Sequence, residues 1–139
     1  MASFDNLVAQ IKTLILTSTK VRAANVYDYA ATNISGYPAV RIYPASVNGA
    51  FSDVARNRRS YFINIQVLQE RSEKGESDSE NIMRELVDEL ISIFDNRNNL
   101  TLNNACQFAR PIPMSWGFDN PEQPDVRVAN ILIECIDIV

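Results

Sequence analysis

The chain has 139 residues, of which 46% are hydrophobic, and this suits one folded domain that buries about two-thirds of its unfolded surface. Its formal net charge is −4, whereas a dedicated nucleic-acid binder needs a surplus of Lys and Arg on one face. The chain contains no histidine. This excludes the commonest general base, the commonest metal ligand and every Ser-His or Cys-His nucleophile arrangement.

The first residues predict an amphipathic helix. Ser3 is a good N-cap for it, because its hydroxyl can accept a hydrogen bond from an amide of the first turn. Apolar residues then recur at spacings of three and four. They are Phe4, Leu7, Val8, Ile11, Leu14 and Ile15.

Three short strand signals follow this helix. Residues 26–29 predict a short strand, and residues 37–44 predict another that is brief or lies at a sheet edge, because prolines stand near both of its ends. Asn48-Gly49 is a turn signal of the kind that closes a hairpin. The chain should then lead into a long strand.

That long strand covers residues 61–69. Tyr61, Ile63, Ile65 and Val67 share one parity, and polar residues occupy much of the other, so the pattern predicts a half-buried strand with one wet face. We expect it to pair with its neighbours in a largely antiparallel sheet.

A second amphipathic helix is predicted to begin near Asp78. Ser77 and Glu80 form a capping-box pattern at its start, and the asparagines of residues 95–99 are expected to end it in a left-handed conformation. Its apolar positions predict one face that lies on a sheet. They are Ile82, Met83, Leu86, Leu90, Ile93 and Phe94.

The last third of the chain predicts two more strands. Residues 105–110 read as the first, and Pro111 and Pro113 predict an extended but poorly paired continuation. Residues 126–139 form the last strand, which is apolar on both parities. It is therefore either central with cover on both sides, or covered on one side by another subunit. The whole chain predicts a single α+β domain with a mostly antiparallel sheet and two main helices packed on one face.

The sequence offers little chemistry for catalysis or for binding a cofactor. Cys106 and Cys135 lie in separate strand-like runs and predict a reduced pair of small apolar residues, with a disulfide as the alternative if those strands are neighbours. The 4 glycines form no phosphate-binding loop. The acidic residues around Glu76 lack the spacing of a calcium loop. We therefore expect no enzyme activity, no cofactor and no metal.

Charged and aromatic residues suggest contacts with a partner. Arg56, Arg58 and Arg59 form a basic cluster that would contact nucleic acid or an acidic partner surface, or else protect a sheet edge from aggregation. Trp116 is either an interface anchor or part of the core. Residues 71–78 are polar and are expected to be mobile until a partner docks. The candidate partner contacts are Arg56, Arg58, Arg59, Glu73, Lys74, Glu76 and Trp116.

The order of elements resembles a known family. Residues 57–67, leading through a polar loop into the helical residues 79–90, together with the closing strand 126–135, resemble the tail terminator and neck proteins of tailed bacteriophages. The resemblance covers nearly the whole chain. It implies a structural, non-enzymatic virion protein that is made late in infection and assembled in the host cytoplasm.

The resemblance also implies specific partners. The protein would form a homo-oligomeric ring, most often of six subunits, at the tail-neck junction. This ring would cap the tail tube and join it to the head connector, with DNA only passing through the lumen and no membrane involved. A head completion or connector protein of the neck is the alternative within this class. A small α+β ligand-binding domain or enzyme is the alternative outside it.

Overall fold

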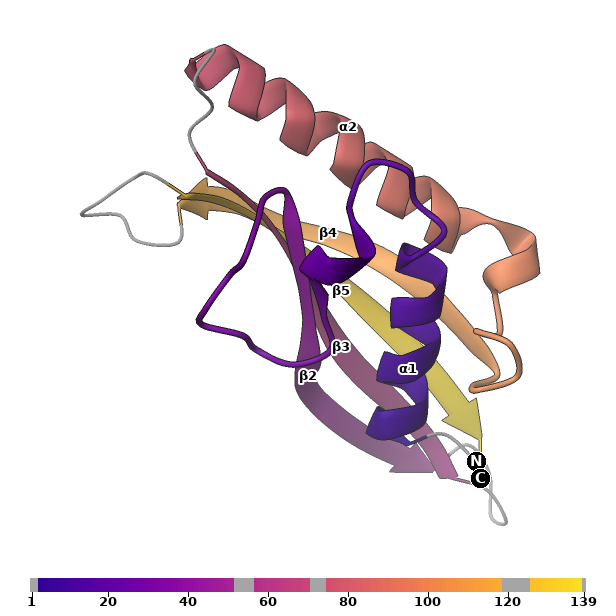
Figure 1. Cartoon of the computed structure of the whole chain (residues 1–139). Coiled ribbons are helices and arrows are strands. Elements are labelled where there is room, and N and C mark those ends of the chain that lie inside the picture. Colours follow the sequence, from indigo (N-terminus) through magenta and orange to yellow (C-terminus); the bar gives the residue numbers. More distant parts are fainter. Residues whose placement is uncertain (1–2, 52–56, 71–74, 119–125, 139) are drawn as a thin grey trace.

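The computed structural model describes residues 3–51, 57–70, 75–118 and 126–138, and it has the expected α+β fold (Figure 1). Its helices are α1 (Phe4–Ile15) and α2 (Glu76–Asp95), with the short 3₁₀ helices η1 (Ala23–Asn25) and η2 (Arg97–Asn99). Its strands are β1 (Val26–Tyr27), β2 (Ala39–Phe51), β3 (Asn57–Glu70), β4 (Phe108–Phe118) and β5 (Val126–Ile138).

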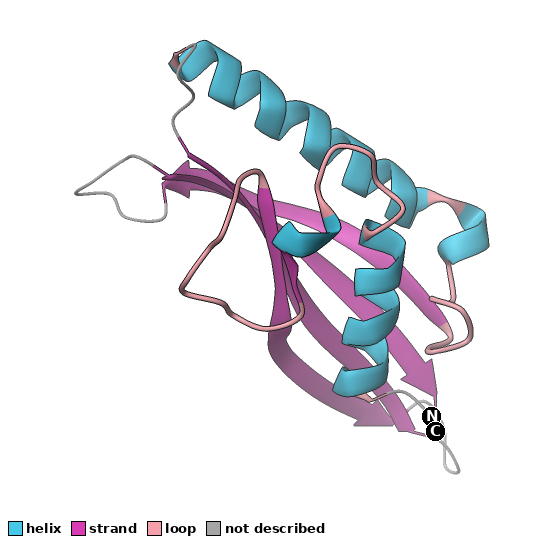
Figure 2. Cartoon of the chain, viewed as in Figure 1, coloured by secondary structure: helices cyan, strands magenta, loops and turns pink. Residues whose placement is uncertain are grey.

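The strands form one sheet in the order β1-β2-β3-β5-β4. β1 and β2 are parallel, and the other neighbours are antiparallel. Both α1 and α2 lie on the same face of this sheet (Figure 2). α1 contacts β1, β2 and β3, whereas α2 contacts β3 and β4. The prediction of a mostly antiparallel sheet with two helices on one face is therefore confirmed.

The core lies between the helices and the odd-numbered residues of the central strands. Ile63 and Ile65 of β3 and Ile131 and Ile133 of β5 face each other in register and are fully or almost fully buried. Leu86 and Leu90 of α2 are also fully buried, as the helical spacing predicts. The buried faces of β3 and α2 were therefore correctly assigned from periodicity alone, whereas the two apolar parities of β5 left its helix-facing side open.

Two predictions for β2 are wrong. The strand has 13 residues and is not brief, although the alternative of an edge position holds beyond Arg41, where β1 ends. Pro44 lies at a β-bulge, where the missing N–H interrupts the ladder only locally. Asn48 and Gly49 do not form a hairpin turn, since they lie within β2 opposite Ser60 and Arg59.

The predicted poor pairing after residue 110 is also wrong. β4 runs through Pro111 and Pro113 and keeps its register with β5 from Phe108 to Phe118, apart from one bulge between Pro113 and Ser115. Because β4 is an edge strand, a proline whose missing N–H would face away from β5 removes no hydrogen bond from the ladder.

The helix starts differ in how they are capped. Ser3 caps α1 as predicted, with its hydroxyl accepting a hydrogen bond from the Asn6 amide at 3.2 Å. α2 begins at Glu76, and the predicted capping box of Ser77 and Glu80 does not form. The N-cap is Gly75 at φ +110°, a conformation that glycine adopts without a steric cost. Residues 76–78 are therefore helical, and residues 71–74 of the predicted mobile segment lie outside the described ranges.

The predicted left-handed closure of α2 is wrong in its position. Asn96 is extended, with φ −67° and ψ 129°, and its side chain accepts a hydrogen bond from the Asn98 amide. Left-handed residues occur later, in the turn that leads into β4. They are Leu102, Asn103 and Asn104.

Candidate partner interface

The described candidate contacts lie at opposite ends of the sheet. We call the end where β2 ends and β3 begins the hairpin end, and the end where α2 begins the loop end (Figure 1). Arg58 is exposed at the hairpin end, opposite Ile138. Glu76 is exposed at the loop end. Of the other candidates, Arg56, Glu73 and Lys74 lie outside the described residues.

The described members of the basic cluster do not act as one patch. Arg58 and Arg59 are adjacent in β3, so their side chains point to opposite faces of the sheet. Arg59 shares its parity with Tyr61 and therefore points to the helix side, where it is partly buried. Of the described members of this cluster, only Arg58 is exposed, and it lies on the other face.

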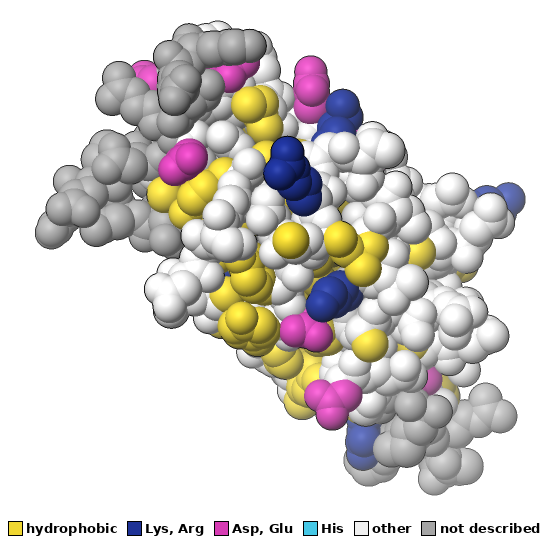
Figure 3. Space-filling view, viewed as in Figure 1, with side chains coloured by type: hydrophobic (Ala, Val, Ile, Leu, Met, Phe, Trp, Pro, Cys, Tyr) yellow, Lys and Arg dark blue, Asp and Glu magenta, His cyan; other side chains and the backbone are white. Residues whose placement is uncertain are grey.

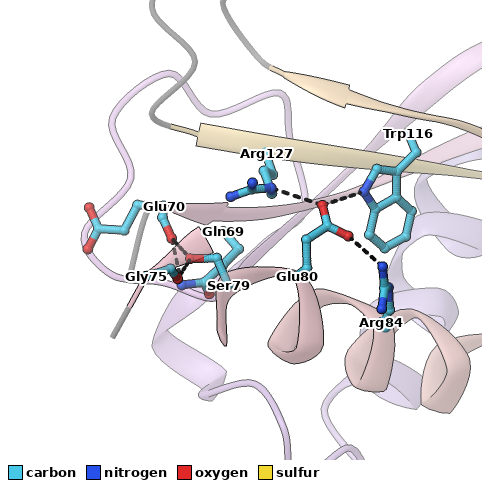
Figure 4. Close-up of polar contacts among 8 residues, drawn as sticks. All are labelled: Gln69, Glu70, Gly75, Ser79, Glu80, Arg84, Trp116 and Arg127. Atoms are coloured by element: carbon cyan, nitrogen blue, oxygen red, sulfur yellow. Dashed lines mark hydrogen bonds and ion pairs between the residues drawn. The ribbon is translucent and has the colours of Figure 1, made fainter. Parts of the chain in front are cut away.

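Trp116 belongs to a polar network at the loop end (Figure 4). It is 43% exposed, which corrects the alternative that placed it in the core. Its indole N–H donates to Glu80 Oε1 at 3.2 Å. The same oxygen accepts a hydrogen bond from Arg127 Nε at 2.9 Å, and Glu80 Oε2 lies 3.5 Å from Arg84.

This network connects α2 to the edge strand β4 and to its neighbour β5. The Arg127 side chain is only 10% exposed, so its charge depends on a nearby carboxylate more than a surface arginine does. The sequence contained a sign that Glu80 faces the sheet, because Glu80 shares a helix face with Met83 and Val87, both of which are buried. Arg127 likewise shares the helix-facing parity of Ala129 and interrupts an apolar row.

A buried polar contact joins the end of β3 to the start of α2 (Figure 4). The Ser79 hydroxyl lies 3.3 Å from the carbonyl oxygens of Glu70 and Gly75, which are its acceptors. Gln69 is 5% exposed and donates from Nε2 to the Glu70 carbonyl at 3.0 Å. Its Oε1 atom has no hydrogen-bond partner among the described residues.

The sheet face opposite the helices carries a polar ladder. The Asn64 amide donates to the Tyr43 hydroxyl at 2.8 Å and lies 3.5 Å from Asn130 Oδ1. Asn130 in turn donates to the Ser115 hydroxyl at 2.8 Å. These four side chains come from β2, β3, β5 and β4 and cross the sheet. The predicted wet face of β3 is therefore confirmed around Asn64, whereas Leu68 on the same face is buried.

The same face also carries apolar side chains that no helix covers. β5 is central, and Val128 on this face lies beneath the connection 28–38, which contributes Ile34 and Tyr37. Farther toward the hairpin end, Phe108 of β4 is 39% exposed, and Leu132 of β5 and Ile112 of β4 are partly exposed. We call this area, with the half-buried Phe62, the uncovered patch.

The cysteines are neighbours in the core. Cys106 and Cys135 are both buried and free, and their thiols are hydrogen-bonded to each other. This contact and burial raise the pKa of Cys135, whereas accepting the hydrogen bond lowers the pKa of Cys106. Cys135 lies in β5 as predicted, but Cys106 lies in the turn before β4 and not in a strand. The reduced state of the pair stays a prediction.

The described residues contain neither a metal-binding cluster nor a membrane-spanning helix. Within those ranges, three or more Cys, Asp or Glu residues nowhere come together in a way that could hold a metal ion. None of the described helices combines the length and the apolar composition needed to span a bilayer. The chain matches no protein-family model and no curated protein.

Proposed function

We propose that this protein is a structural ring protein of the tailed-bacteriophage tail terminator class. In this role it caps the end of the tail tube and joins the tail to the head connector. The uncovered patch is the observation that supports the proposal. A strand in the centre of a sheet with apolar residues on both faces is stable in water when both faces are covered. α1 and α2 cover one face of β5, and the connection 28–38 covers the other only near Val128.

The distribution of charge is compatible with head-to-tail assembly. Exposed Arg58 lies at the hairpin end and exposed Glu76 at the loop end, so neighbouring subunits can bring unlike charges together. A repeating head-to-tail contact either closes into a ring or grows into a filament, and a structure that caps a tube has to close. With −4 per subunit, a ring of six carries −24, which favours a lumen that lets DNA pass without holding it.

The proposal is tested by native mass spectrometry and negative-stain imaging of the purified protein, with and without assembled tail tubes. We expect closed rings, either free or at tube ends. A strict monomer in both samples, with no binding to tube ends, would contradict the proposal.

A pair of variants tests the surface used for assembly. Phe108→Ser removes an exposed aromatic side chain from the uncovered patch. Leu16→Ser is the control, because it removes an aliphatic side chain of similar exposure, 42%, at the end of α1. We expect Phe108→Ser to weaken ring formation at least tenfold, because apolar side chains at the centre of an interface supply most of its binding energy. Leu16→Ser should assemble as the parent does.

A further inference from the structure

The outer edge of β2 is open over most of its length. β1 pairs with β2 only at Val40 and Arg41. Among the described residues, no strand pairs with this edge from Ile42 to Phe51. The chain leaves the edge at residue 28 and runs through the long connection to β2 (Figure 2). A line of backbone donors and acceptors is therefore left for an added strand.

A groove runs beside this open edge. It has a volume of about 300 Å³ and lies between the start of α1, the Pro44 bulge of β2 and the end of β1. On the molecular surface, apolar side chains gather around the groove, and acidic side chains lie next to them (Figure 3). The groove is lined by Phe4, Asp5, Val8, Ala9, Asp28 and Pro44.

Two carboxylates stand in this lining. Asp28 Oδ2 lies 3.8 Å from Lys12 Nζ, so this carboxylate is already paired with a cation. Asp5 is exposed and makes no ion pair with any described residue. An apolar lining beside an unpaired carboxylate suits the side chain of Lys or Arg, whose methylene stem packs on apolar surface while its cationic end contacts the carboxylate.

β2 of a second copy also has an open edge, but its residues 42–47 contain no Lys or Arg that could lie beside Asp5. The other described strands do not supply a suitable partner either. β3 and β5 are paired on both sides. The free edge of β4 lacks outward donors where Pro111 and Pro113 stand, since they share the parity of Ala109, whose amide points away from β5 to the Leu100 carbonyl at 2.7 Å. A strand from another protein avoids this mismatch.

We propose that β2 is a strand-addition site for an extended segment of a different protein, which pairs with the backbone between Ile42 and Val47 and places a Lys or Arg in the groove beside Asp5. Val47, 48% exposed and on the helix-facing parity, extends the apolar contact toward the hairpin end. This inference does not rest on ring formation. It assigns a binding surface apart from the uncovered patch.

The test uses capped nine-residue peptides of alternating threonine and valine. The central residue is lysine, arginine, norleucine or glutamate. Binding is measured by fluorescence anisotropy, and the site is located by hydrogen exchange of the backbone amides of residues 42–47, apart from Pro44, which has no N–H. We expect the lysine and arginine peptides to bind and to slow exchange there, the norleucine peptide to bind less tightly, and the glutamate peptide to bind least. Raising the ionic strength should reduce the difference between lysine and norleucine.

Asp5→Asn isolates the contribution of the carboxylate. Because an exposed ion pair contributes little, we expect this variant to weaken lysine-peptide binding about two- to fivefold and to leave norleucine-peptide binding unchanged. Glu76→Gln is the matched control, since it also removes an exposed acid from the first turn of a helix, at the loop end. It should bind both peptides as the parent does.

Three outcomes would overturn the proposal. The first is unchanged exchange at residues 42–47 with every peptide at millimolar concentration. The second is equal loss of binding in Asp5→Asn and Glu76→Gln. The third is protection of the same amides that rises with protein concentration without peptide, because a second copy would then occupy the edge. Each is read from the peptide and exchange data, whatever the oligomeric state.

Discussion

The two edges of the sheet are built in different ways. At the β4 edge, Pro111 and Pro113 remove outward donors, the Ala109 amide is bonded to Leu100, and the Glu80 network binds the strand to α2. At the β2 edge, the two-residue strand β1 covers only the first positions, and Pro44 is the only proline between Ile42 and Val47. One edge is closed to further pairing and the other is open.

This difference shows how a sheet can permit association on one side alone. An edge strand with free donors and acceptors is a template for pairing with another chain, and natural sheets block it with proline or a covering segment. In this protein β4 has two prolines and an outward amide that is already bonded, whereas β2 has Pro44 alone and is covered by β1 only at Val40 and Arg41. The resulting asymmetry favours addition of a partner strand at β2 and disfavours continuous sheet growth through β4.

The largest effect is expected from removing the support that α2 gives to the sheet. Leu90→Ala should lower the free energy of unfolding by about 2 to 5 kcal/mol, because it leaves a cavity at a fully buried position. Urea denaturation measures this change. Glu85→Gln is the control, since it alters only an exposed ion pair with Lys20, and it should cost less than about 1 kcal/mol. The reverse ranking would mean that the buried face of α2 is wrongly assigned.

A smaller effect should follow from weakening the β4 side alone. Glu80→Gln removes the charge that faces Arg127 and Trp116, and we expect a loss of about 1 to 3 kcal/mol in the free energy of unfolding. Trp116 is the only tryptophan, so its fluorescence reports the change at this site. Asp88→Asn changes an exposed acid on the same helix and should leave both readings unaltered. Equal denaturation midpoints for the two variants would show that the network does not stabilise the edge.

The turn that leads into β4 offers a stabilising change. Asn104 has φ +66°, so Asn104→Gly should raise the free energy of unfolding by up to about 1 kcal/mol, because glycine adopts this conformation more readily. Thermal denaturation measures the shift. Asn98→Gly lies in η2 and should instead be destabilising by about 0.5 to 1 kcal/mol. A loss of stability in both variants would contradict the left-handed assignment.

The smallest effect on stability is expected from opening the closed edge. Pro111→Thr introduces an outward N–H in β4 and should change the free energy of unfolding by less than about 1 kcal/mol. It should nevertheless promote association between copies, seen as earlier elution in size-exclusion chromatography at high protein concentration. Ser115→Thr keeps the hydroxyl that Asn130 contacts and serves as the control. Identical elution of parent and Pro111→Thr would show that proline does not block the edge.

Local patterns were sufficient to predict much of the fold. The helical spacing of Leu86 and Leu90 and the alternation of Ile63 and Ile65 identify their buried faces, because neighbouring residues on one element determine the period. The N-cap Ser3 was predicted for the same reason, since its hydroxyl bonds an amide three residues away. Of the candidate contacts, Arg58, Glu76 and Trp116 are indeed exposed at the surface.

Tertiary structure decided what those local patterns leave open. Glu80 was assigned to a capping box from its neighbours in sequence, but its carboxylate bonds Trp116 and Arg127, which are 36 and 47 positions away. Pro111 suggested poor pairing, yet at an edge its missing N–H faces away from β5. The openness of β2 likewise depends on where β1 ends and the chain turns away. Residue types and local spacing determined the elements, whereas strand order determined which backbone groups, carboxylates and apolar side chains remain available to a partner.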